Sequence, residues 1–174
     1  MKHILITLSL LLAFNGYTKE PKRLIKNYGN FKQVSNIEFE IPKRFKAVFD
    51  VYTSNDDKEK VNGGINTVAR YLNMHYDAGV KLKNIKTAIV IHGAAGKDIL
   101  KNSAYNKYYE TDNPNAELLK QLHDNGVRII FCGQTGEFRS YERDEIVDFV
   151  DISLSAITAL LSLQSQGYGL INFN

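Results

Sequence analysis

The sequence predicts an α/β fold built around a parallel sheet with helices on both faces. Strand and helix signals alternate from residue 45 to the end of the chain, which is the pattern of parallel strands joined by helical crossovers. The predicted strands at 85–91 and 127–132 are nearly continuous apolar runs, as expected when both faces of a strand are covered. With 174 residues, the chain is long enough for one domain with a substantial core.

The start of the chain predicts a secretory signal peptide rather than a part of this fold. A short positive start, residues 1–3, precedes an apolar run at 4–14 that only Thr7 and Ser9 interrupt, and small and polar residues follow at 15–18. The run is too short to span a bilayer comfortably, although an uncleaved anchor is the alternative. We therefore predict a signal peptide at 1–18, an irregular basic lead-in at 19–44 and one domain at 45–174. The mature protein would be periplasmic or secreted.

The first half of the domain predicts two strands and one long helix. A strand is expected at 45–52, followed by a loop at 53–57 whose polar side chains can cap a helix. Residues 58–78 have helical periodicity, and Gly79 ends the helix. A second strand is expected at 85–91. The connection at 97–112 gives no clear pattern, and a short helix would fit there.

The second half predicts two more helices and three more strands. Asn113 and Pro114 mark a helix start, and Gly126 marks its end. A third strand at 127–132, a polar loop at 133–143 and a fourth strand at 149–153 follow. Ser153 or Ser155 is expected to cap a very apolar helix that ends at Gly167, and residues 168–173 give the last strand.

Cys132 is the strongest functional candidate, because it is the only cysteine and stands where the third strand ends. Ligands of α/β folds gather at this edge of the sheet. A thiolate there would be stabilised by the amides of the turn at Gly133 and Gln134, or by a cation such as Arg139. In an exported protein, a lone cysteine is a free thiol or forms an intermolecular disulfide. The alternative is a buried cysteine that acts as a small apolar side chain.

His92 is the second candidate, because it follows the second strand and should open at the same edge as Cys132. A thiol and an imidazole on one edge form a possible nucleophile and base. The alternative is a histidine that hydrogen-bonds a loop carbonyl.

Other site types are not supported by the sequence. The stretch Gly93–Lys97 fails as a phosphate-binding loop, since Ile91 and Asp98 stand where such a loop needs Gly and Ser or Thr. The remaining histidines lie in the signal or in predicted helices, so no metal site is expected. No serine-hydrolase elbow appears, and no organic cofactor is expected. The net charge of +3 is too weak to indicate nucleic acid or an anionic membrane as a partner.

Two segments resemble the DsrE/DsrF-like sulfur-relay family. The first runs from Asn113-Pro114 through Gly126-Val127 to Cys132-Gly133-Gln134, and the second from Ser155-Ala156-Ile157 to Gly167-Tyr168. His92-Gly93 after the second strand is similar too, and the resemblance covers about residues 45–173. It implies a three-layer α/β/α domain with a five-stranded parallel sheet, assembled as trimers or hexamers. It also implies that Cys132 carries sulfane sulfur as a persulfide and passes it to a partner protein, with His92, Gly93 and Gln134 lining the same pocket.

These observations predict a sulfur-transfer or sulfane-sulfur-binding protein that uses Cys132 as the persulfide carrier. Such a protein would be a sulfurtransferase-like carrier whose partner is a sulfur donor or acceptor protein. No cofactor or metal is expected. The residues expected near the thiol are His92, Gly93, Gly133, Gln134 and Arg139. The alternative is a non-catalytic module on the same fold, for assembly or for binding a small ligand, with Cys132 buried. The chain departs from the cytoplasmic relay members by its export signal and by the lack of a second cysteine.

Overall fold

A five-stranded parallel sheet forms the centre of the computed structural model, which describes residues 20–173 of the chain. The predicted signal peptide at 1–18 lies outside these residues. The strands are β1 (Phe45–Val51), β2 (Ile85–Ile91), β3 (Arg128–Cys132), β4 (Asp151–Ser153) and β5 (Gly169–Ile171). Their order across the sheet is β4-β3-β2-β1-β5, and every neighbouring pair is parallel. The predicted fold class is confirmed.

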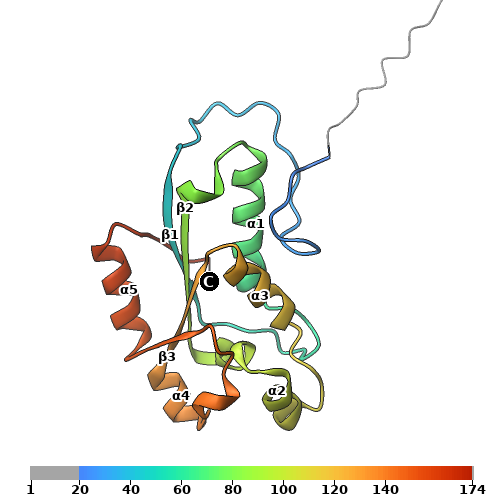
Figure 1. Ribbon diagram of the computed structural model, residues 1–174, viewed down its shortest axis with the longest axis vertical. Coiled ribbons are helices and arrows are strands. Elements are labelled where there is room, and N and C mark those ends of the chain that lie inside the picture. Colours follow the sequence, from blue (N-terminus) through green and yellow to red (C-terminus); the bar gives the residue numbers. More distant parts are fainter. Residues whose placement is uncertain (1–19, 174) are drawn as a thin grey trace, which may run out of the picture.

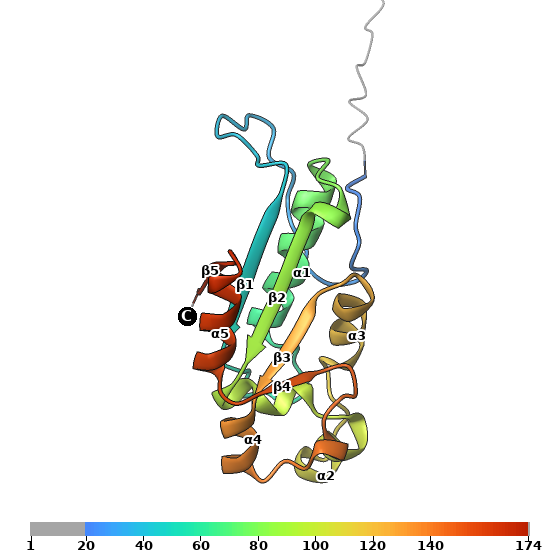
Figure 2. The same cartoon turned by 60° about the vertical axis from the view of Figure 1, so that its left-hand side comes forward.

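Helices cover both faces of the sheet and make the three layers visible in Figures 1 and 2. The helices are α1 (Gly63–Asp77), α2 (Asn102–Tyr109), α3 (Ala116–Asp124), α4 (Gly133–Arg139) and α5 (Ala156–Ser165). Short 3₁₀ helices are η1 (Leu82–Asn84), η2 (Gly93–Ile99) and η3 (Arg143–Glu145). Helices α1 and α3 pack on one face, over a large apolar core, and α5 packs on the other face, over a smaller one.

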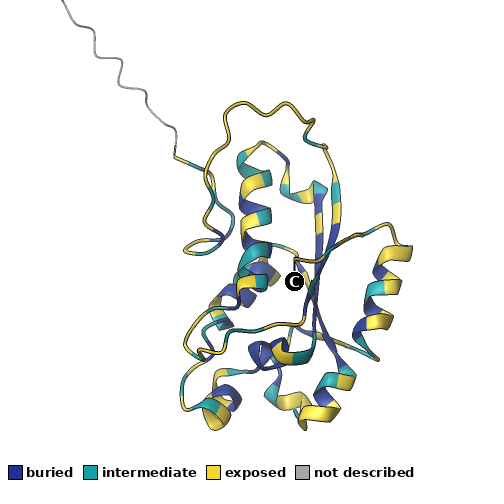
Figure 3. Ribbon diagram, turned by 180° about the vertical axis from the view of Figure 1, so that it is seen from behind, coloured by how far each residue is buried: buried dark blue, intermediate teal, exposed yellow. Residues whose placement is uncertain are grey.

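Residue alternation along the strands explains the two cores. In β1, Phe49 and Val51 belong to the larger core, whereas Val48 belongs to the smaller core beneath α5. The central strands are therefore buried on both faces, as their continuous apolar sequences predict. Figure 3 shows that exposed residues concentrate on the outer sides of the helices and in the lead-in.

The lead-in has no helix or strand in residues 20–44, but it packs along α1. Ile25 is fully buried in the larger core. The buried amide side chain of Asn73 accepts hydrogen bonds from the backbone N–H groups of Leu24 and Ile25 and donates to the carbonyl oxygen of Tyr28. This segment is therefore anchored to the domain by its backbone.

The predicted starts of two helices are wrong in informative ways. Helix α1 begins at residue 63 and not at 58, because the side chain of Asn62, not one from the 53–57 loop, accepts from the N–H groups of Gly64 and Ile65. Helix α3 begins at residue 116, because the Asn113 side chain holds the turn before it by accepting from Asn115 N–H.

The expected polar loop at 133–143 begins with a helix, α4. Its glycines allow close packing: a Cβ at Gly133 would lie 2.7 Å from the Ser153 carbonyl oxygen, and one at Gly136 would lie 3.2 Å from the Phe131 ring. The glycines that indicate a loop in the sequence instead let a helix follow β3 without a gap.

Candidate functional site

The carboxyl ends of three neighbouring strands place Asp50, His92 and Cys132 on one edge of the sheet. Asp50 pairs in register with Val90, and Ile91 pairs with Phe131. Ile91 and Phe131 are the last pair of this ladder, and the same register continued by one residue would bring His92 opposite Cys132, at the strand spacing of about 4.8 Å. Cys132 in turn pairs with Ser153 of β4.

The three side chains also lie on the same face of the sheet. Val48, Val90 and Ile130 all belong to the smaller core beneath α5. Because side chains alternate along a strand, the residues two positions further on, Asp50, His92 and Cys132, share that face. A carboxylate, an imidazole and a thiol therefore follow one another across β1, β2 and β3.

The Cys132 thiol is free and buried, with 5% of the residue exposed. It packs in the smaller core with Ala156, Ala159 and Leu163 of α5. Cys132 is both the last residue of β3 and the N-cap of α4, and its side chain makes no capping hydrogen bond. The thiol is thus largely enclosed by the smaller core.

The His92 imidazole is bound to Asp50. Its Nε2 atom lies 2.9 Å from Asp50 Oδ1, and the two side chains are 28% and 13% exposed. Asp50 Oδ2 accepts a hydrogen bond, at 3.3 Å, from the side chain of Asn172, a residue that lies just after β5. The ring of Tyr52 lies beside that of His92, with centroids 5.7 Å apart. His92 therefore has a side-chain partner rather than the loop carbonyl of the simpler interpretation.

The other residues predicted for the site lie at different positions around this edge of the sheet. Gly93 has φ of +57° and donates its N–H to Thr135 Oγ1, at 3.1 Å, which joins the end of β2 to α4. Gly133 lies against β4, and Gln134 is exposed on α4. Arg139 lies at the far end of α4, where it interacts with Tyr141 and not with the thiol.

Asp50, Asn172 and Thr135 are site residues that the sequence analysis missed. Asp50 had a signal, because it is a polar residue near the end of a strand, two positions after the buried Val48 on the same face. It shares a face with the residues that end the next two strands. Asn172 and Thr135 had no such signal, since only the pairing of β5 with β1 and the helical form of α4 bring them to the edge.

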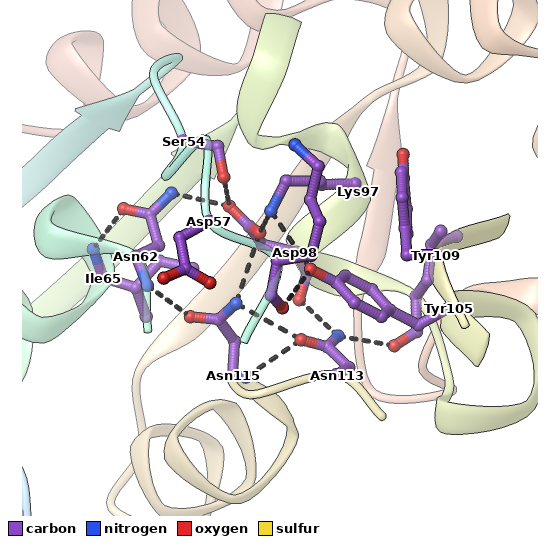
Figure 4. A network of polar contacts seen from close by, with 12 residues as sticks. Ser54, Asp57, Asn62, Ile65, Lys97, Asp98, Tyr105, Tyr109, Asn113 and Asn115 are labelled. Carbon is purple, nitrogen blue, oxygen red and sulfur yellow. Dashed lines mark hydrogen bonds and ion pairs between the residues drawn. The ribbon is translucent and has the colours of Figure 1, made fainter. Parts of the chain in front are cut away.

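A separate network of buried polar groups lies beneath the loops on the α1 side (Figure 4). The Lys97 ammonium lies 2.6 Å from Asp98 Oδ1, and both side chains are nearly inaccessible. Asp98 also accepts hydrogen bonds from the side chains of Ser54, Asn62 and Asn115. Burial alone would lower the pKa of Lys97, but the hydrogen bond and charge of Asp98 outweigh it and raise that pKa. Lys97 is thus occupied by a carboxylate, which agrees with the rejection of a phosphate-binding loop.

Two hollows in the surface of residues 20–173 are not lined by Cys132. One of about 280 Å³ lies between β4 and α5 and is lined by Ile130, Ser153 and Leu163, but not by Cys132. Another, of about 690 Å³, lies under the lead-in at the opposite end of the sheet, beside Ile37 and Met74. Within residues 20–173, no three His, Cys, Asp or Glu side chains form a group that could hold a metal ion.

The family model for the DsrE/DsrF-like family matches residues 46–173, which is most of the chain and the whole of the sheet except its first residue. The chain belongs to the DsrE/DsrF-like family. This membership confirms the resemblance found in the sequence, and it covers all of the edge residues described above.

Comparison with solved structures supports the same fold. The chain is similar to MTH1491 of Methanobacterium thermoautotrophicum, a protein of unknown function, with 16% identity and a TM-score of 0.52 over 74% of this chain and 98% of that one. The ychN protein of E. coli gives 14% identity and a TM-score of 0.48 over 74% and 99% of the two chains. No curated protein matches the sequence. The similarity to MTH1491 supports the fold alone.

Among the helices of residues 20–173, none is long and apolar enough to cross a membrane.

Proposed function

We propose that this DsrE/DsrF-like protein carries sulfane sulfur on Cys132. The observation that carries the proposal is the alignment of Asp50, His92 and Cys132 on one face, at the carboxyl edge of three adjacent strands. Family membership supports it, because the resemblance to relay members assigns the persulfide to the position of Cys132. Chemistry at a lone thiol needs a thiolate, and the neighbouring imidazole is a suitable acceptor for its proton.

The transfer is a thiol exchange in which atoms and charges balance. The Cys132 proton passes to His92, and the thiolate attacks the outer sulfur of a persulfide or polysulfide donor. One S–S bond forms, the donor's S–S bond breaks, and the donor leaves as a thiolate that takes up a proton. An acceptor thiolate removes the sulfur from Cys132 by the same exchange, so no net oxidant, metal or organic cofactor is required.

Intact mass measurement tests the proposal. The full chain is incubated with polysulfide and weighed without reduction, and a gain of one sulfur atom is expected. Cys132→Ser, a nearly isosteric control, should show no gain. Wild-type protein that gains no sulfur from any sulfane donor, although its thiol reacts with an alkylating reagent, would refute the carrier function.

A second candidate function, a non-catalytic assembly or ligand-binding module, is favoured by one specific observation. Cys132 belongs to the smaller core together with Ala156 and Ala159, and the residue is 5% exposed. Labelling of the native protein with a thiol reagent separates the two functions. A thiol that reacts only after denaturation supports the module.

We further propose that the protein is exported and assembles as a homo-oligomer, as trimers or hexamers. Four apolar side chains of β4 and α5 and the turn between them are exposed, and two of them, Ile157 and Leu161, are 70% and 64% exposed. Apolar groups collected on one surface are typical of protein interfaces. A sulfur donor or acceptor protein would be a transient partner at the strand edge.

A further inference from the structure

The strand edge contains a third group that the proposed function does not yet use, the carboxylate of Asp50. Asp50 reaches the His92 ring from the neighbouring strand, and it is held from its other side by the amide of Asn172. Its side chain is only 13% exposed. A carboxylate fixed at both oxygens has a defined position relative to the imidazole.

The chemistry of this contact determines which ring nitrogen is basic. An ionised carboxylate can only accept hydrogen bonds, so the 2.9 Å contact requires a proton on His92 Nε2. In the neutral ring, Nδ1 then carries the lone pair. Proton acceptance by His92 therefore occurs at Nδ1.

We propose that Asp50 is a positioning residue that holds the His92 imidazole ready to take the Cys132 proton at Nδ1. The inference rests on the proposed function of Cys132. The proton moves from the thiol sulfur to Nδ1, the imidazolium so formed is stabilised by the Asp50 carboxylate, and the thiolate is left to react. The titratable groups in contact with His92 are Asp50, at 2.9 Å, and Tyr52, whose ring centroid lies 5.7 Å from that of the imidazole, and Asp50 supplies the negative charge. Cys132 follows on β3, one residue past the last pair of the β2–β3 ladder.

The first test observes the imidazole directly by NMR of the full chain labelled with ¹⁵N. The His92 Nε2–H proton should be visible in water because its hydrogen bond slows exchange, and His92→Gln assigns the signal. Asp50→Ala should abolish it. Asp151→Ala, which removes an exposed carboxylate at the start of β4, should leave it in place. A His92 signal that persists in Asp50→Ala would overturn the proposal.

The second test measures the rate at which iodoacetamide alkylates Cys132 at neutral pH. Asp50→Ala and His92→Gln should each slow alkylation by about tenfold or more, and the double variant should be no slower than either single variant, because the two residues act as one unit. Asp151→Ala should react at the wild-type rate. Asp50→Asn keeps the size of the side chain and should show the same loss if Asp50→Ala does not fold.

The outcomes separate this inference from the carrier function. An Asp50→Asn thiol that reacts at the wild-type rate, or a wild-type thiol that is inert in the native protein, overturns the role of Asp50. Alkylation that depends on Asp50, in a protein that never gains sulfur from polysulfide, supports the role of Asp50 and refutes only the sulfur-carrier function.

Discussion

Lys97 and Asp98 are opposite charges buried together beneath the loops that support the strand edge. Asp98 is inaccessible and accepts hydrogen bonds from four side chains. These partners come from the loops after β1 and β2 and from the turn before α3. The single carboxylate therefore links three separate parts of the chain below Asp50 and His92, and its contribution is structural.

We predict that Asp98→Ala lowers the free energy of unfolding by about 3–5 kcal/mol, because it leaves the Lys97 ammonium buried without its counter-ion. Urea denaturation measures the change. Asp148→Ala, at an exposed carboxylate, should change stability by less than about 0.5 kcal/mol. The double variant Lys97→Met/Asp98→Leu should recover only part of the loss, because it removes the unpaired ammonium but leaves the donors of Ser54, Asn62 and Asn115 without their acceptor. Equal stability of Asp98→Ala and Asp148→Ala would contradict this account.

At the scale of elements, the sequence predicted the strands and helices that follow from periodicity. It did not predict features that depend on contacts between residues far apart in the chain. The five strands and the helices α1, α3 and α5 follow from apolar runs and helical stripes. Helix α4 could not be predicted, because glycines in a sequence usually indicate a turn. Their reason here is the close approach of Gly133 to β4, which only the structure shows. Cys132 and His92 were predicted from their strand ends, whereas the Asp50–His92 contact depends on side-chain placement across two strands.

Gly133 gives a direct test of how α4 is seated. We predict that Gly133→Ala destabilises the fold by about 1–3 kcal/mol, since the new methyl group would lie 2.7 Å from the Ser153 carbonyl oxygen. Gly63→Ala is the matched control, because nothing lies within 4 Å of a Cβ there, and it should be neutral or slightly stabilising. Thermal unfolding followed by circular dichroism compares the two. Similar melting temperatures would show that α4 is not held against β4.

At the scale of the whole molecule, the exposed apolar surface of β4, α5 and their connecting turn lies next to the buried thiol. It consists of Ile152, Leu154, Ile157 and Leu161. Helix α5 covers the sheet alone on this side, whereas α1 and α3 share the other side (Figure 1). An interface formed here would contact the same helix that covers Cys132.

We predict that Ile157→Asp/Leu161→Asp converts the proposed assembly into monomers without loss of helical structure. Each charge would have to be buried without a partner at the interface. Light scattering after size-exclusion chromatography gives the mass, and circular dichroism verifies the fold. Val34→Asp, at an equally exposed apolar residue in the lead-in, should not change the mass. A monomeric wild-type protein would refute the assembly itself.

The lengths of the strands have a consequence for aggregation. The edge strands β4 and β5 contain three residues each, while the seven-residue strands β1 and β2 lie inside the sheet. A short edge strand offers few unpaired backbone N–H and C=O groups with which a strand of another molecule can pair. The longest strands are thus paired on both sides in the folded molecule. We expect contacts between folded copies to form through side chains, and fibril growth to require that β1 or β2 be released from the sheet.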